Sequence, residues 1–293
     1  MITGSACLAF GPWLVRLADV GPLASAFWRQ ALAVPFLFAL VLVLGGGRGG
    51  AGGGGGAKGV RAPAFAGSTG RIIALAVLAG TAFAADLSVW HLGILRTTLA
   101  NATLLANGAT FLLPLYGLVI LKQRLTGPQW WALACAAAGV ALLLGRSAEL
   151  SPRHLAGDLL CLAAALFYTV YLIAIEKVRG TLEAFPALAL ATLASAIALA
   201  PLAGTGLFGG AFWPQDWSPI LGLAIGSQVI GQGLIVYAVR HLSPLVVGLT
   251  LLVQPTISAI IGAWRFGEVP GPLELLGALM VVAALLIARL PGR

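Results

Sequence analysis

Ten apolar segments follow one another along the chain, and each is long enough to cross a lipid bilayer as a helix. The segments are 1–18, 22–45, 71–93, 97–121, 129–146, 156–178, 182–206, 217–240, 243–264 and 272–290. Inside a bilayer the backbone must satisfy its own hydrogen bonds, which only helices and closed barrels achieve. The apolar runs are continuous, whereas barrel strands alternate over roughly 10 residues. The sequence therefore predicts an all-α membrane protein with ten transmembrane helices.

Composition excludes a water-soluble fold. Sixty per cent of the residues are hydrophobic and only 9% are charged, against about 25% charged in soluble domains. The net charge of +8 comes mainly from short loops, so we expect a lipid bilayer and no nucleic acid as partner. Cys7, Cys135 and Cys161 fall within predicted spans without metal-ligand spacing, and no metal or other cofactor is expected.

The distribution of basic residues predicts how the chain is oriented. With the N-terminus inside, 11 of the 17 Lys and Arg residues fall on the cytoplasmic side. We therefore expect a multi-pass membrane protein with both termini in the cytoplasm. Residues 45–70 begin with a glycine tract and predict a flexible cytoplasmic loop. Lys58 is followed by Gly59, so the tract is not a phosphate-binding loop.

A weak internal repeat divides the chain into two halves. Residues 97–128 return in degraded form at 242–272, with Thr98 matching Ser243 and Gly117 matching Gly262. This predicts a first five-helix repeat over 1–146 and a second over 147–293. Each repeat crosses the membrane five times, an odd number, so the second copy begins on the opposite side from the first. The two repeats should therefore be inverted, as in many secondary transporters.

Four stretches resemble the EamA-type transporters of the drug/metabolite transporter superfamily. They are AFWRQALA at 26–33, ILRTTLANATLL at 94–105, GDLLCLAAALFYTVY at 157–171 and GEVP at 267–270. The resemblance implies ten spans, a central cavity and transport of small metabolites, often export of amino acids or drugs. The family often has Glu at both repeat turns, and here the first turn has Gln123 while the second keeps Glu268.

Polar residues in the fourth span form one candidate cavity lining. They occupy a 60° stripe of a helix and comprise Thr103, Asn107, Thr110 and Pro114. The alternative is that they bond to neighbouring helices, at about 0.6 kcal/mol each. Pro114 should also kink the span.

Asp86 is the most costly residue of the predicted spans, since a carboxylate at membrane depth costs about 3 kcal/mol. It shares a helix face with Phe83 and Trp90. It should recognise a substrate amine, titrate for proton coupling, or form a structural ion pair. The candidate partners are Arg96, Arg29, Arg16 and His91.

Aromatic and amide side chains complete the candidate site. Aromatic residues suit a flat or hydrophobic substrate, and the candidates are Trp13, Tyr168 and Tyr171. The alternative for each of them is packing in the core or in an interfacial belt. Amides bind both an amine and a carboxylate without the cost of a buried charge. They are Gln228, Gln232 and Gln254 in the second half, with Thr250 one turn before Gln254.

These observations predict a secondary transporter that exports small metabolites. Amino acids, aromatic or hydrophobic ones among them, are the expected substrates, moved by alternating access through a central cavity between the repeats. A passive facilitator or channel for small amphipathic solutes and a multidrug exporter remain alternatives. An enzyme is not expected, because nine acidic residues and three histidines form no metal, triad or paired-carboxylate arrangement. The sequence leaves the substrate, direction, coupling ion and oligomeric state open.

Overall fold

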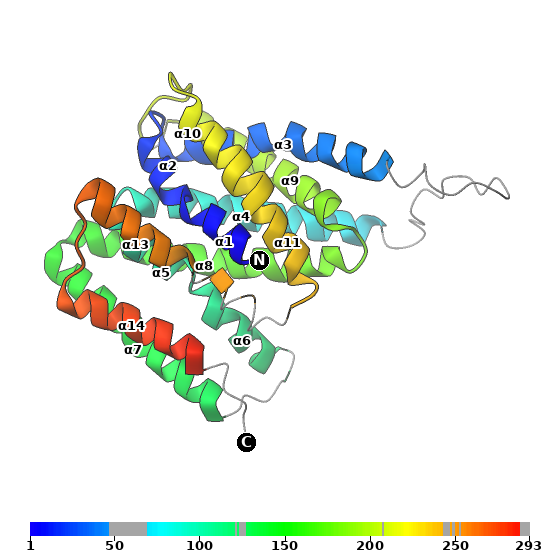
Figure 1. Cartoon of the computed structure of the whole chain (residues 1–293). Helices are drawn as coiled ribbons and strands as arrows, with labels where there is room; N and C mark the ends of the chain where they lie inside the picture. The colour runs from blue at the N-terminus through cyan, green and yellow to red at the C-terminus, as the bar shows by residue number, and fades with distance from the viewer. Residues whose placement is uncertain are drawn as a thin grey trace.

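The computed structural model describes residues 1–46, 69–120, 122, 127–206, 208–242, 247, 250–251 and 253–287. Helices dominate these residues (Figure 1), and their β pairing is a single bridge between Val20 and Ala211. The predicted all-α class is therefore confirmed for the described part of the chain. The predicted loop 45–70 lies outside it except at its ends, where Gly46 ends one helix and Thr69 begins the next.

Each predicted span contains at least one described helix. The first half has α1 Ile2–Ala9, α2 Gly11–Leu17, α3 Pro22–Gly46, α4 Thr69–Ile94, α5 Leu99–Ala106, α6 Ala109–Val119 and α7 Gly127–Leu150. The second half has α8 Pro152–Arg179, α9 Ala184–Gly204, α10 Ser218–Leu221, the π-helix η2 Gly222–Gln232, α11 Gly233–Val239, α13 Val253–Phe266 and α14 Pro272–Ile287. Six helical segments are long and apolar enough to cross a membrane.

Two predicted spans are interrupted within their length. The first span breaks at Phe10, and α2 then begins with Gly11 and Pro12, as a proline in a first helical turn favours. The fourth span breaks at Asn107 and Gly108, whereas the sequence predicted a kink at Pro114, a position through which α6 continues. A Cβ atom on Gly108 would lie 2.9 Å from the Leu105 carbonyl oxygen and 3.2 Å from Cβ of Ala165 on α8, so this crowded position favours glycine.

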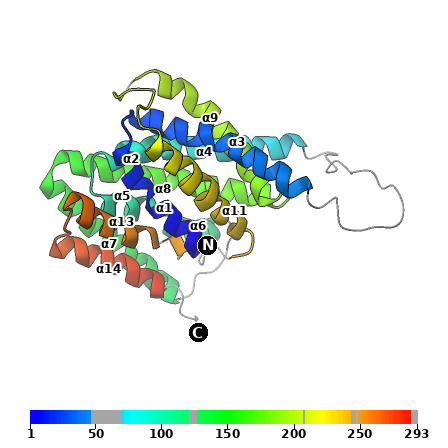
Figure 2. The ribbon, with the colours of Figure 1, turned by 45° about the horizontal axis from the view of Figure 1, so that its top comes forward.

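Helix packing places α4 at the centre of the bundle, against α8 on one side and α9 on another. The largest cluster of buried hydrophobic residues forms around these three helices. A Cβ atom on Gly80 would lie 2.5 Å from the Ala191 carbonyl oxygen, so α4 and α9 pack closely at this glycine. Helices α7 and α14 form a pair that lies along one side of the bundle (Figures 1 and 2).

A charged cluster around Arg16 joins the two halves at one end of the bundle. Arg16 pairs with Glu268 and donates from Nη2 to the Thr97 carbonyl oxygen at 2.6 Å. The second carboxylate oxygen of Glu268 accepts the Leu99 N–H at 2.7 Å, where α5 begins. The cluster therefore fastens α2 and the α4–α5 turn to the turn between α13 and α14.

Replacing Arg16 with glutamine should weaken this connection. We expect the free energy of unfolding in detergent to fall by about 1–3 kcal/mol, because bonds to a charged partner are lost. Arg265→Gln is the matched control, since Arg265 is exposed in the last turn of α13 and its side chain forms no hydrogen bond or ion pair within the described residues. The free energy of unfolding of this control should fall by no more than about 0.5 kcal/mol. Equal losses in the two variants would contradict the role assigned to Arg16.

Candidate functional site

A cavity lies in the middle of the bundle, between α1, α3, α4, α5, α8, η2 and α13. Seven of the predicted site residues line it, namely Asp86, Trp90, Thr103, Asn107, Tyr168, Gln232 and Gln254. Leu8, Arg29, Phe83, Leu87 and Ala106 complete the wall. The cavity volume of about 40 Å³ has room for a few water molecules. Small-molecule sites usually measure about 300–1,000 Å³, so a metabolite fits only after the surrounding helices move apart.

Opposite charges face this cavity without neutralising each other. Asp86 on α4 is 6% exposed and Arg29 on α3 is 1% exposed. These two side chains form no ion pair, although the long-range attraction of Arg29 acts on Asp86. Within the described residues, Asp86 accepts no hydrogen bond, and Nε and Nη1 of Arg29 donate none. The cavity therefore offers an anionic acceptor and a cationic donor that both retain bonding capacity.

Gln228, which does not line the cavity, fixes the Arg29 side chain by a hydrogen bond. Its Oε1 atom accepts from Nη2 of Arg29 at 3.3 Å and from Nε2 of Gln30 at 3.1 Å. Its Nε2 atom donates to Thr192 at 3.0 Å. Gln228 was predicted to line the cavity beside Gln232, but the structure places only Gln232 there. Both residues belong to η2, and π-helical turns are frequent at functional sites.

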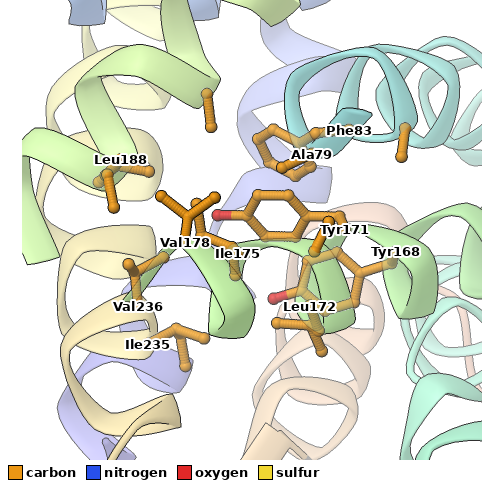
Figure 3. Packing of buried hydrophobic residues seen from close by; sticks show 14 of the residues in the cluster. Ala79, Phe83, Tyr168, Tyr171, Leu172, Ile175, Val178, Leu188, Ile235 and Val236 are labelled. Atoms are coloured by element: carbon orange, nitrogen blue, oxygen red, sulfur yellow. The ribbon is translucent and has the colours of Figure 1, made fainter. Parts of the chain in front are cut away.

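Three stacked rings form one wall of the site (Figure 3). Tyr171 lies between Phe83 and Tyr168, with ring centroids 4.5 Å and 5.6 Å away, respectively. Phe83 and Tyr168 reach the cavity, whereas Tyr171 is completely buried behind them and was predicted to line it. The Tyr168 hydroxyl accepts from Nε2 of Gln232 at 3.4 Å, so the wall joins α4, α8 and η2.

Local backbone bonds orient the polar residues of α5. The Thr103 hydroxyl donates to the Leu99 carbonyl oxygen at 2.8 Å, and Nδ2 of Asn107 donates to the Thr103 carbonyl oxygen at 2.8 Å. Nε1 of Trp90 donates to the Ala102 carbonyl oxygen at 3.3 Å. Asn107 thus lies in the cavity wall at the break between α5 and α6.

Two further predicted residues do not line the cavity, and the side chain of a third is not described. Trp13 packs beside Phe10 with ring centroids 6.3 Å apart, and its indole nitrogen is buried. The Thr250 hydroxyl donates to the Val247 carbonyl oxygen at 2.9 Å. The side chain of Thr110 lies outside the described part of the structure.

The structure shows which of the four proposed partners of Asp86 share the cavity with it. Arg16 pairs with Glu268, and Nδ1 of His91 bonds to the Ser25 hydroxyl at 2.7 Å. Arg29 is the member of the four that lines the cavity with Asp86. The sequence pointed to Arg29 only as one candidate cation, although an arginine eight residues inside an apolar span already indicated a buried functional charge.

Asp158 on α8 provides an internal contrast to Asp86. It is completely buried, and its carboxylate accepts from the Thr97 hydroxyl and from Nδ2 of Asn101, the latter at 3.2 Å. It lies outside the cavity lining. Asp158 therefore fixes α8 against the start of α5, whereas the carboxylate of Asp86 remains available to a ligand.

The two aspartates should respond oppositely to replacement by asparagine. Asp158→Asn should lower the free energy of unfolding by about 1–3 kcal/mol, because hydrogen bonds to a buried charge are weakened. Asp86→Asn should leave it unchanged or raise it, since binding sites retain groups that the folded state does not satisfy. Unfolding of both purified variants in detergent, without solutes, measures the difference. A larger loss for Asp86→Asn would show that Asp86 has a structural partner.

The crystal structure of another protein aligns with this chain at a TM-score of 0.69. The alignment covers 100% of this chain and 97% of the other protein's chain. The identity of 18% means that this likeness concerns the fold alone. None of the curated proteins compared with the chain matches it.

Residues 155–290 match the EamA-like transporter family, whose members carry small solutes across membranes. This agrees with the multi-pass apolar helices and with a transporter rather than an enzyme. The match covers α8 to α14, the half that supplies Tyr168, Gln232 and Gln254 to the cavity. The resemblance drawn from the sequence is thereby confirmed, since residues 155–290 match the EamA-like transporter family.

Proposed function

We propose that the protein is a secondary transporter that exports amino acids, with a preference for aromatic or other apolar side chains. The observation that carries this proposal is the pair of unneutralised charges, Asp86 and Arg29, on one aromatic-lined cavity. Transport proceeds by alternating access between two inverted five-helix repeats, 1–146 and 147–293, in the bacterial inner membrane.

Charge complementarity favours a zwitterion over other small solutes. The ammonium group of an amino acid would bind the Asp86 carboxylate, and its carboxylate would bind the free guanidinium nitrogens of Arg29. Each buried charge costs about 3 kcal/mol while it lacks a partner in the membrane, and a zwitterion compensates both at once. A solute with one charge leaves the other protein charge uncompensated.

The remaining wall suits the rest of an amino acid. Phe83, Trp90 and Tyr168 present aromatic surface to the cavity, which favours an apolar or flat side chain. Gln232 and Gln254 add neutral amides from the second half, and Oε1 of Gln232 is buried without a partner among the described residues. These amides can orient the bound molecule without adding charge.

Helix packing supports the two-repeat arrangement. When each span of one half is replaced by the span at the same position in the other half, the main helix contacts recur. The contact of α4 with α8, the third and sixth spans, has its counterpart in η2 with α1, the eighth and first. The contact of α4 with α9 likewise corresponds to η2 with α3. Helix α5 contacts α13, and α7 contacts α14. Each of these pairs joins spans at the same position in the two halves, so the exchange leaves the pair unchanged. Such a pattern is expected of two similar units related by a pseudo-two-fold axis.

The narrow cavity agrees with a transporter that changes shape. Its volume of about 40 Å³ excludes an amino acid until the halves separate at one end. At the end marked by Arg16 and Glu268, that separation requires their ion pair to break. Asp86 is the carboxylic acid of the cavity lining, so any proton coupling would act through this residue.

Counter-flow of labelled phenylalanine into proteoliposomes tests the proposal. Wild-type protein should give saturable uptake that unlabelled internal phenylalanine accelerates. Phenylethylamine lacks the carboxylate and phenylpropionate lacks the amine, so neither should compete as well as phenylalanine. Asp86→Asn should reduce phenylalanine affinity about tenfold or more, because a hydrogen bond to a charged group is lost.

The matched control is Asp216→Asn, since Asp216 is exposed and its side chain bonds only to Ser218 among the residues described. This variant should transport as the wild type does. Saturable uptake without counter-flow would favour a passive facilitator. Transport of apolar cations without competition by amino acids would favour a multidrug exporter and refute the zwitterion site.

A further inference from the structure

A second pocket lies at one end of the bundle and shares no lining residue with the central cavity. Its volume of about 570 Å³ falls in the range of small-molecule sites. Two arginines and a histidine, Arg179, Arg240 and His241, gather in its wall with one acidic residue, Glu183. We propose that this pocket binds the phosphate group of an anionic phospholipid.

The first arginine is held rigidly in the pocket wall. Arg179 is 3% exposed, and its Nε and Nη1 atoms donate to the carbonyl oxygens of Val236 at 3.1 Å and Leu182 at 2.7 Å. These bonds use carbonyl groups near the ends of two helices. Nη2 donates to no acceptor within the described residues, which leaves one fixed guanidinium edge for an anion.

A helix N-terminus adds to the positive potential of the pocket. The first residues of the 21-residue helix α9 line the pocket, beginning at Ala184. Glu183 at the cap position makes no side-chain capping bond to this helix. The N–H groups of Ala184 and Phe185 in the first turn have no acceptor within the helix, whereas Pro186 has no N–H. Such groups at the start of a helix bind phosphate readily. Arg179, Arg240 and α9 thus direct positive charge into one concave site.

The pocket also lies at the level where membrane headgroups are found. Four candidate spans begin or end around it, at Leu44, Arg179, Ala184 and Val239. Leu44 and Tyr237 line the pocket and are 50% and 57% exposed, respectively, so apolar surface continues from the basic site along the helices. A phospholipid matches this gradient, with its phosphate on the arginines and its acyl chains over Leu44 and Tyr237. Basic pockets between transmembrane helices bind anionic headgroups in this way.

Native mass spectrometry of the full-length protein, titrated with phosphatidylglycerol or phosphatidylcholine, tests the proposal. Phosphatidylglycerol should bind more tightly. Arg240→Gln should weaken its binding about fivefold, the effect of one basic residue at a membrane surface. The Arg240 side chain is exposed and donates no hydrogen bond within the described residues, so this variant should fold normally.

Arg71→Gln is the matched control, since Arg71 is exposed at the start of α4, at the same end of the bundle, but outside the pocket (Figure 1). It should bind phosphatidylglycerol as the wild type does. Equal weakening by both variants, or equal affinity for the two lipids, would overturn the site. Displacement of the lipid by millimolar inorganic phosphate would overturn the assignment to a lipid and identify the pocket as a site for free phosphate.

Discussion

Hydrocarbon offers no water to a buried charge, and the whole bundle depends on how each such charge is compensated. Most are neutralised locally. Arg16 pairs with Glu268, Asp158 accepts from Thr97 and Asn101, and Arg179 donates to two carbonyl groups. These bonds fasten helices that are distant in sequence. Asp86 and Arg29 differ because they share a cavity and keep free bonding capacity. The structure thus separates charges that hold helices together from charges that a solute can satisfy.

The sequence predicted the helices well because their lengths follow from bilayer thickness, which is a local constraint. It also identified most of the cavity lining, since polar residues such as Asp86, Asn107 and Gln254 stand out in apolar spans. It did not predict the break at Gly108, where Ala165 on another helix packs close to the chain. Nor could it predict that Gln232 lines the cavity while Gln228 does not, because the Gln228 amide instead bonds to Arg29 on another helix. Such features are set by tertiary contacts.

The two halves contribute different chemistry to the central cavity. Asp86 and Arg29 come from the first half, whereas Gln232 and Gln254 come from the second. In a transporter that rocks its halves, a solute bound to the charges moves relative to the amides. The strong charge contacts would then remain constant, while the weaker amide contacts form and break. This division allows tight recognition without fixing the solute in one conformation, because only contacts that differ between states shift their equilibrium.

The peripheral pocket is connected to the cavity through shared helices. Helix α8 carries Tyr168 at the cavity and Arg179 at the pocket, and the η2–α11 segment carries Gln232 before Arg240. A movement that widens the cavity between these helices also changes the distance between Arg179 and Arg240. A bound phosphate would favour the conformation in which both arginines reach it. By linkage, the lipid then alters the affinity of the cavity for its solute as much as the solute alters the affinity of the pocket for lipid.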